Sequence, residues 1–324
     1  MTLDAQILSA LRLAGTEGLH ASTMAVRFNC PLAAVTARVA ELRRLGYEIE
    51  ATPHFGFRLV ASPDVLHADE LLSRLAPGQV IGRDVRVFQE TSSTNDVVEK
   101  LARDGVREGV VVLAEAQSRG RGRLGRKWVS PAGMGLWFSV LLRPNLPLGA
   151  VTQLTIMAAT AVARALRAGT GLTPQIKWPN DILLRGRKVA GILTELSAET
   201  DRVAHVVLGI GVDVNVMEFP EELAAVATSL AREAGHAFNR AEIAAAIFAE
   251  LDRDYARVSR GDFPALAEEW EQQCITLGQQ VRIHIGSRTL TGRAESLDTD
   301  GALLLRSEYG HLERIIGGDV VIEK

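Results

Sequence analysis

The residues best suited to chemistry in this 324-residue chain are the arginines of one glycine-rich segment, Gly120-Arg121-Gly122-Arg123-Leu124-Gly125-Arg126-Lys127-Trp128. With Arg119, five basic residues fall within nine positions, and no acidic residue separates them. Glycine lets the backbone approach a ligand closely, and guanidinium groups bind carboxylate or phosphate oxygens in a bidentate manner. Because like charges repel and glycine loses much entropy on ordering, we expect a loop that is mobile alone and ordered over an anion. A solvated basic loop or an RNA-binding tract would have a similar composition.

A second candidate group lies in Lys177-Trp178-Pro179-Asn180-Asp181 and in the nearby Lys188. Lys177 could neutralise a phosphate, and Asp181 could bind a magnesium ion or orient an attacking amine. Lys188 precedes Ala190-Gly191, whose small side chains leave room for a ligand. A strand with a surface ion pair explains the first segment equally well, and a lone lysine beside a turn is usually solvated.

Two glycines mark a third segment, Gly209-Ile210-Gly211-Val212-Asp213-Val214-Asn215. It lacks the third glycine and the following helix of a dinucleotide-binding fingerprint, so we reject that interpretation. A buried strand interrupted by glycines is the plain alternative.

In their order along the chain, Ser92–Asn95, these three segments and Lys188–Leu193 resemble the biotin protein ligases. The resemblance covers essentially the whole chain and is to the bifunctional bacterial type, a biotin operon repressor fused to a ligase. It implies that ATP activates biotin to biotinyl-5′-adenylate, and that biotin then passes to a lysine of a biotin carboxyl carrier protein, a subunit of acetyl-CoA carboxylase. Two anions must meet in such a reaction, so fixed cations and Mg²⁺ are needed, whereas a nucleophilic side chain is not.

The resemblance also implies roles for individual residues. The biotin-binding residues would be Ser93, Thr94, Asn95, Gln117, Arg121, Gly122, Arg123 and Lys188. The adenylate- or ATP-binding residues would be Arg121, Arg123, Trp128, Asn180, Asp213 and Asn215, with Thr228-Ser229-Leu230 in a second covering segment. The catalytic residues would be Lys188, Arg123, Asp181 and Lys177, and the metal ligands Asp181 and Asp213. The chain departs from the family at Asp213, where Asn is usual, and the added negative charge could strengthen metal dependence.

The elements that precede these residues predict a separate domain over residues 1–62, a winged helix-turn-helix. The first helix is indicated by the helical spacing of Leu3, Ile7, Leu8 and Leu11. The second helix would have Ser22 or Thr23 as its N-cap and would end at Phe28. The third helix follows Pro31 and is indicated by the apolar stripe Leu32, Val35, Val39 and Leu42. Tyr47–Ala51 and Phe57–Val60 would form the wing. A generic three-helix interaction module has the same pattern. The exposed face of the third helix is mostly alanine, so contacts with biotin operon DNA would fall to Arg38, Arg43 and Arg44, and we expect weak or narrowly tuned binding.

Residues 63–274 predict the catalytic domain, an α+β fold with helices packed on a mixed sheet. The predicted strands are Val110–Glu115, Leu136–Leu142, Asp181–Leu184, Val189–Leu196 and Val203–Val214, and the predicted helices Thr152–Arg167, Glu222–Ala234 and Glu242–Val258. Residues 275–324 predict a small SH3-like β-barrel with strands Val281–Ile285, Thr289–Glu295, Leu303–Ser307 and Val320–Ile322.

Composition is consistent with a cytoplasmic enzyme. The net charge is −3, 47% of residues are hydrophobic, and neither a membrane span nor a secretion signal is predicted. The two cysteines, Cys30 and Cys274, form no disulfide framework or zinc pattern. We expect a homodimer without membrane contacts. Two other functions are open at this stage: a biotin-sensing repressor that has lost catalysis, and a sister ligase for lipoate or octanoate.

Overall fold

The computed structural model describes residues 1–199 and 202–323. Backbone contacts divide the chain into two compact units, one of residues 1–77 and 239–245 and one of residues 78–238 and 246–324. Each unit has a hydrophobic core of its own.

The first unit contains three helices of two or more turns and a two-stranded antiparallel sheet. Its elements are α1 Leu3–Ala14, α2 Ala21–Phe28, α3 Leu32–Arg44, β1 Glu48–Thr52, β2 Gly56–Ala61 and the short α4 Ala68–Leu72. The core side chains are Ile7, Leu8, Leu11, Met24, Val35, Val39, Leu42, Tyr47 and Ile49. The order of the predicted helices and hairpin is therefore confirmed, although α4 was not predicted.

Two details of the prediction for this unit are wrong. Ser22 and Thr23 do not cap α2, because the helix begins at Ala21 after an extended His20. Leu32 does not belong to the buried stripe of α3, because it is the first residue of the helix and is 52% exposed, whereas Val35 is fully buried. The turn after α2 is as expected, since Asn29 adopts a left-handed conformation that asparagine tolerates.

A seven-stranded sheet, ordered β3-β4-β5-β9-β8-β7-β6, forms the centre of the second unit. Its strands are β3 Asp84–Thr91, β4 Val110–Gln117, β5 Gly135–Leu142, β6 Gln175–Lys177, β7 Asp181–Leu184, β8 Arg187–Glu199 and β9 Arg202–Asp213. Only the pair β3–β4 is parallel among the described strands, so the sheet is mixed as predicted. The predicted hairpin at Arg185-Gly186 is confirmed, with positive φ at both residues. The strands β3 and β6 were not predicted.

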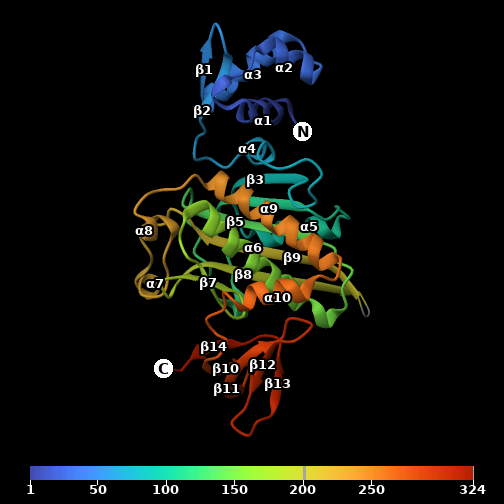
Figure 1. The fold of residues 1–324 in the computed structure, drawn as a ribbon, viewed down its shortest axis with the longest axis vertical. Helices are drawn as coiled ribbons and strands as arrows, with labels where there is room; N and C mark the ends of the chain where they lie inside the picture. The colour runs from blue at the N-terminus through green and yellow to red at the C-terminus, as the bar shows by residue number, and fades with distance from the viewer. Residues whose placement is uncertain (200–201, 324) are drawn as a thin grey trace. The chain divides into compact units, whose positions relative to one another are not determined.

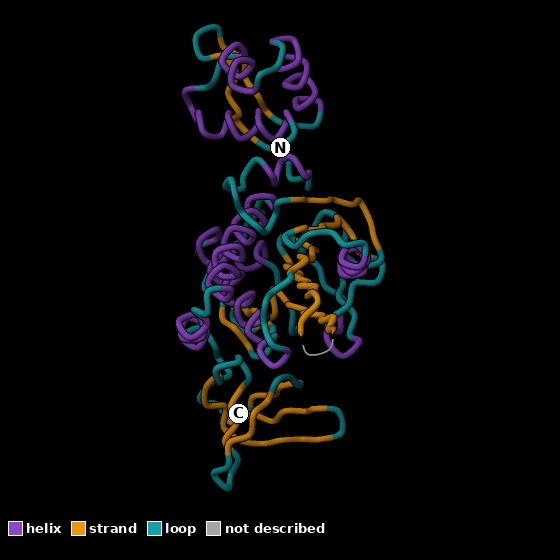
Figure 2. The backbone as a smooth tube through the Cα atoms, turned by 90° about the vertical axis from the view of Figure 1, so that its right-hand side faces the viewer, coloured by secondary structure: helices purple, strands orange, loops and turns teal. Residues whose placement is uncertain are grey.

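Helices lie on both sides of this sheet (Figure 2). They are α5 Thr94–Arg103, α6 Thr152–Thr170, α7 Glu221–Ala224, α8 Leu230–Ala234, α9 Arg240–Ser259, which begins in the first unit, and α10 Phe263–Glu271. On one face, Val98 and Ala102 of α5 pack on Val112 of β4 and Leu141 of β5. On the other face, the rings of Phe138 of β5 and Phe248 of α9 pack in a T-shaped arrangement, with their centroids 5.2 Å apart. Side chains alternate along a strand, so β5 contributes to both layers.

One helical stretch of the second unit is both long and apolar. Leu148–Thr170, which includes α6, is long and apolar enough to cross a membrane by length and composition alone, but 61% of its most apolar window is buried inside the structure. Burial of this kind is what a core helix packed on a sheet requires.

The predicted helix Glu222–Ala234 is wrong. The segment forms two short helices, α7 and α8, because Val226 and Thr228 between them pair with the backbone of Lys188 at the start of β8. The Ser229 side chain then caps α8 by accepting from the Arg232 amide. The helices α5 and α10 were not predicted at all.

The C-terminal residues form a five-stranded antiparallel sheet, shown in red in Figure 1. Its order is β13-β12-β11-β10-β14, with β10 Gln280–Ile285, β11 Arg288–Leu297, β12 Leu303–Arg306, β13 Leu312–Ile315 and β14 Asp319–Ile322. Four of these strands were predicted and β13 was not. Alternating buried residues, among them Val281, Ile283, Leu303 and Leu305, give the sheet an apolar face.

Candidate active site

A cavity of about 670 Å³ in the second unit brings the predicted segments together. Its lining includes most of the predicted site residues: Ser93, Thr94, Asn95, Gln117, Arg121, Gly122, Arg123, Trp128, Lys177, Asn180, Asp181, Lys188 and Asp213. Asn215 and the predicted covering segment Thr228-Ser229-Leu230 are not part of the lining. The side-chain amide of Asn215 donates to and accepts from the backbone of Phe238 and so holds the loop after β9. The predicted contact of Asn215 with the adenylate stays a prediction.

One end of the cavity is a neutral, buried hydrogen-bond network at the N-terminus of α5. Gln117 Oε1 accepts from the Thr94 amide at 2.9 Å and from the Thr94 hydroxyl at 3.2 Å. Ser139 lies 2.7 Å from Thr94 and donates to Asn95 Oδ1 at 2.5 Å. Sequence reasoning missed Ser139, which no motif marks. Groups fixed in this way can recognise a ligand that both donates and accepts hydrogen bonds.

The glycines of β9 are required by the close approach of site residues. A Cβ on Gly209 would lie 2.3 Å from Asn95 Oδ1, and one on Gly211 would lie 2.5 Å from the Trp128 indole. Gly191 of β8 has the same role, with Trp128 at 2.9 Å and Lys188 at 3.0 Å. Gly209 and Gly211 therefore lie in a buried strand, as the plain alternative predicted, and their need for room beside Asn95 and Trp128 is a finding of the structure.

The basic loop carries two arginines with opposite electrostatic settings. Arg121 pairs with two carboxylates, Asp96 at 2.6 Å and Glu195 at 3.1 Å. Hydrogen bonding to Glu195, followed by that to Asp96, raises the pKa of the Arg121 guanidinium. Arg123 has no ion pair among the described residues, and its guanidinium donates to neutral oxygens, Asn180 Oδ1 at 3.1 Å and the Gly318 carbonyl at 3.5 Å.

Burial around Arg123 lowers the pKa of its guanidinium, with the more distant charges of Asp181 and Asp319 acting the other way. A partly desolvated cation without a carboxylate partner is a ready site for an anionic ligand. The next arginine in the loop, Arg126, pairs with Asp319 of β14, so the loop is tied to the C-terminal sheet.

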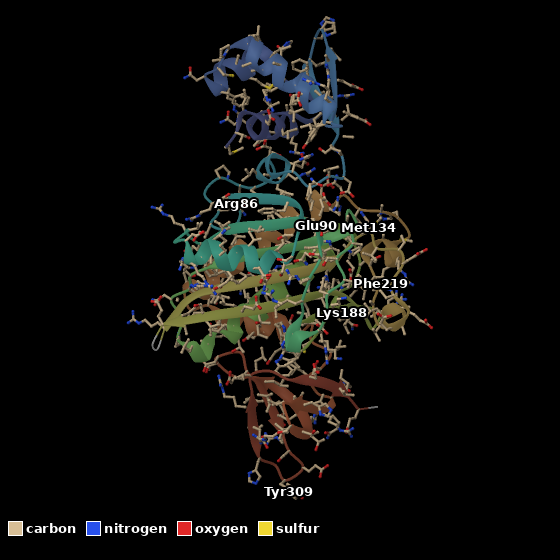
Figure 3. All side chains as sticks on the ribbon, turned by 180° about the vertical axis from the view of Figure 1, so that it is seen from behind. Arg86, Glu90, Met134, Lys188, Phe219 and Tyr309 are labelled. Carbon is tan, nitrogen blue, oxygen red and sulfur yellow. The ribbon has the colours of Figure 1, made fainter. Side chains whose placement is uncertain are left out.

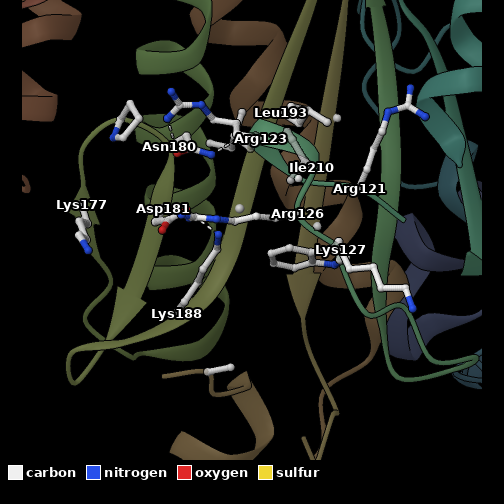
Figure 4. Close-up of a pocket in the computed structure, with 18 of the residues that line it drawn as sticks. Arg121, Arg123, Arg126, Lys127, Lys177, Asn180, Asp181, Lys188, Leu193 and Ile210 are labelled. Atoms are coloured by element: carbon white, nitrogen blue, oxygen red, sulfur yellow. Dashed lines mark hydrogen bonds and ion pairs between the residues drawn. The ribbon is translucent and has the colours of Figure 1, made fainter. Parts of the chain in front are cut away.

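Lys188 lies at the centre of the charged end of the cavity, 2.6 Å from Asp181 (Figure 4). Its ammonium also lies 5.1 Å from the ring centroid of Trp128, within cation–π range. The segment before α8 pairs with the Lys188 backbone: Lys188 N donates to Val226 O, and Thr228 N donates to Lys188 O, both at 2.8 Å. Phe219, in the loop that precedes this segment, lines the same cavity, and Figure 3 shows it on the same side of the second unit as Lys188.

Lys177 lines the same cavity but is separated from the Asp181–Lys188 pair in Figure 4. Its predicted phosphate contact stays a prediction. Asp213 is buried, and burial raises the pKa of its carboxyl well above the usual range, only partly opposed by the charge of Lys188. The described residues contain no group of three or more His, Cys, Asp or Glu that could hold a metal ion without help from a ligand.

The three arginines predicted to contact DNA lie in the first unit, and each has a partner within the chain. Arg38 forms a two-point ion pair with Asp4, with Nε 2.6 Å from Oδ1. Arg43 donates to the Ile49 carbonyl and lies over the Phe57 ring, and Arg44 pairs with Glu41. Arg38 is the least available of the three for a phosphate, because a bidentate carboxylate already occupies its guanidinium.

Comparison with known proteins agrees with this geometry. Residues 87–213 match the biotin/lipoate A/B protein ligase family, and residues 276–322 match the biotin protein ligase C-terminal domain. The chain is 36% identical to the bifunctional ligase/repressor BirA of Bacillus subtilis over 98% of each chain, and 36% identical to the biotin–[acetyl-CoA-carboxylase] ligase of Mycobacterium tuberculosis over 74% of this chain and 89% of that one. The solved biotin protein ligase of Aquifex aeolicus in complex with biotin and ATP superposes with a TM-score of 0.64 at 31% identity, covering 75% of this chain and 99% of that one. This chain belongs to the biotin protein ligase family.

Proposed function

We propose that this chain is an ATP-dependent biotin–[acetyl-CoA-carboxylase] ligase. The biotin carboxylate attacks the α-phosphate of ATP to give biotinyl-5′-adenylate, and pyrophosphate leaves. The amine of a lysine on the biotin carboxyl carrier protein then attacks the acyl carbon, and AMP leaves. The observation that carries the proposal is the division of one cavity into a neutral hydrogen-bonding end around Asn95 and a cationic end around Arg123 and Lys188.

The neutral end supports biotin over lipoate or octanoate. The ureido ring of biotin both donates and accepts hydrogen bonds, and Thr94, Asn95 and Gln117 supply complementary groups. A dithiolane ring or an alkyl end has no N–H donor and no carbonyl acceptor to match these groups. We therefore assign Ser93, Thr94, Asn95 and Gln117 to the biotin head group.

The cationic end supports adenylate formation rather than a sensor without catalysis. Arg123 and Lys188 stabilise the charge that develops between carboxylate and phosphate, and Trp128 offers a ring face to the adenine. Asp181 is 2.6 Å from Lys188 and holds its ammonium toward the cavity. A sensor would need only to bind biotin, and the phosphate-binding cations would serve no purpose in it.

Mg²⁺ fits this site only when it binds together with the phosphates of the nucleotide. Magnesium commonly takes one or two carboxylates together with substrate phosphates, and the described residues hold no metal-binding cluster of their own. Asp181 would supply a carboxylate, while the raised pKa of Asp213 makes it the weaker ligand. The ion would neutralise phosphate charge and leave the orientation of substrates to the protein.

We further propose three domains: a winged helix-turn-helix over residues 1–62, the catalytic domain over 63–274 and an SH3-like barrel over 275–324. The three helices with a β-hairpin support the first, and the five-stranded antiparallel sheet supports the last. We also propose that the chain represses the biotin operon by binding its DNA, that it forms a homodimer and that it is cytoplasmic. The first of these is supported by the bifunctional ligase/repressors that match over nearly the full length.

One mass measurement tests the ligase. The purified chain is incubated with biotin, ATP, Mg²⁺ and a biotin carrier domain, and we expect the carrier to gain one biotin at one lysine. Omission of ATP and replacement of the acceptor lysine by arginine are the controls. Modification of the carrier by lipoate in place of biotin, or no modification despite biotin binding, would contradict the proposal.

A further inference from the structure

The neutral network at one end of the cavity is continuous with the two ends of the basic loop. At the C-terminal end of the loop, the Ser130 hydroxyl accepts from Gln117 Nε2 at 2.9 Å. Gln117 is in turn hydrogen-bonded to Thr94, Thr94 to Ser139, and Ser139 to Asn95. At the N-terminal end of the loop, Arg121 joins the same network through Glu195. A single carboxylate on β8 therefore links the head-group residues to the start of the loop.

Glu195 makes three contacts at once. Its Oε2 accepts from Asn95 Nδ2 at 2.6 Å and from Arg121 Nη2 at 3.1 Å, while its Oε1 accepts from Arg121 Nε at 3.1 Å. With Ser139 donating to Asn95 Oδ1, the orientation of the Asn95 amide is determined on both sides. No sequence motif marked Glu195.

We propose that Glu195 is a positioning residue that orients the Asn95 amide for the biotin head group and, through Arg121, anchors the basic loop. The part of this inference that concerns biotin rests on the proposed function, whereas the part that concerns the loop applies to the ligand-free protein. Arg121 then acts as an anchor, since its charge is neutralised by two carboxylates and it points away from Lys188 (Figure 4). Arg123 is then the arginine of the loop that binds the anionic ligand.

The two contacts of Glu195 depend on different properties and can be separated. The bond from Asn95 needs only an acceptor oxygen, which a glutamine retains. The interaction with Arg121 needs negative charge and two acceptor oxygens, and an amide supplies only one. Glu195→Gln therefore removes the anchor and keeps the orientation of Asn95, whereas Glu195→Ala removes both.

Two readouts follow the two properties. Trypsin cleavage within residues 119–128 of the ligand-free full chain, located by mass spectrometry, reports loop anchoring. Biotin affinity by calorimetry reports the Asn95 amide. We expect Glu195→Gln to be cut at least threefold faster with biotin affinity within threefold of wild type. Glu195→Ala should be cut equally fast and bind biotin at least tenfold more weakly.

Glu90→Gln on the exposed part of β3 is the matched control and should change neither readout (Figure 3). Thermal unfolding of each variant separates a local effect from general destabilisation. Wild-type cleavage in both Glu195 variants, or equal biotin affinity in Glu195→Ala and Glu195→Gln, would overturn the proposal. If the wild-type chain binds no biotin, the proposed function fails, and the cleavage data alone still decide whether Glu195 anchors the loop.

Discussion

Replacement of Arg123 is the sharpest test of the site, because this guanidinium stands in a partly desolvated position without an acidic partner among the described residues. In Arg123→Gly the cation is lost, and in Arg123→Gln it is lost while a side chain remains. Comparison of the two variants separates the loss of charge from the added flexibility of glycine, which is about 0.5–1 kcal/mol.

The expected magnitude follows from the contacts of Arg123. A hydrogen bond to a charged group contributes about 1.5–3 kcal/mol, so the adenylate should be held about ten- to a hundredfold less tightly. The ligand-free protein should change little, because the bond to Asn180 that is lost is offset by relief of a desolvated charge. Arg121, in contrast, already has two carboxylates, so its charge contributes less to ligand binding.

Release of the intermediate is measured in two ways. The chain is loaded with labelled biotin, ATP and Mg²⁺, and the adenylate that remains bound after rapid gel filtration is counted. A bystander protein without an acceptor sequence is added in parallel, and its labelled lysines are found by mass spectrometry. Both Arg123 variants should lose the intermediate and label the bystander. Arg119→Gly, an exposed arginine of the same loop, is the control and should do neither.

Retention of the adenylate at the wild-type level in both Arg123 variants would refute the reasoning. Equal loss in Arg119→Gly would also refute it, since the effect would then come from the total charge of the loop. A large drop in the unfolding free energy of the free protein would show that Arg123 is structural.

Five further predictions concern the site and the N-terminal unit. Lys188→Ala should impair adenylate synthesis, measured as pyrophosphate release, because a cation is removed from between two anions, and near-normal release would exclude Lys188 from the site. Asp181→Asn should spare biotin binding in calorimetry yet slow turnover of the carrier; unchanged turnover would contradict its assignment. Gly209→Ala should weaken biotin binding at least tenfold in the same assay, since the added Cβ would lie 2.3 Å from a head-group amide oxygen, and unchanged affinity would show that β9 can shift. Burial raises the folded-state pKa of Asp213, so at neutral pH this carboxyl makes the fold less stable than a neutral side chain would. Asp213→Asn should raise the Tm at pH 7 but hardly at a pH below about 3.9, where the carboxyl is protonated in both states, and an equal rise at both would refute the pKa argument. The N-terminal unit should bind DNA upstream of biotin-synthesis genes weakly or with narrowly tuned specificity in a gel shift with biotin and ATP present, and nanomolar specific binding at physiological salt would show that Arg38, Arg43 and Arg44 are undervalued.

Local patterns in the sequence were sufficient for much of the fold and for the chemistry of the site. Apolar runs predicted the strands that became β4, β5, β7, β8 and β9, since buried strands need continuous or alternating apolar residues wherever they pair. Each of the motifs around Arg123, Asp181 and Lys188 is a continuous stretch of sequence, so its residue types could be recognised without knowing which side chains lie opposite it in the fold. The strand β3 was missed because it is a partly exposed edge strand with Arg86, Gln89 and Glu90 among its residues.

Tertiary structure alone decided which charges are free and which are already paired. Asn95 and Glu195 are 100 positions apart, and Arg121 and Glu195 are 74 apart, yet a single carboxylate joins all three. The sequence cannot distinguish Arg121 from Arg123, two residues of one type in one loop. The fold distinguishes them, because electrostatic energy depends on distance and burial, and both are properties of the packed chain rather than of its order.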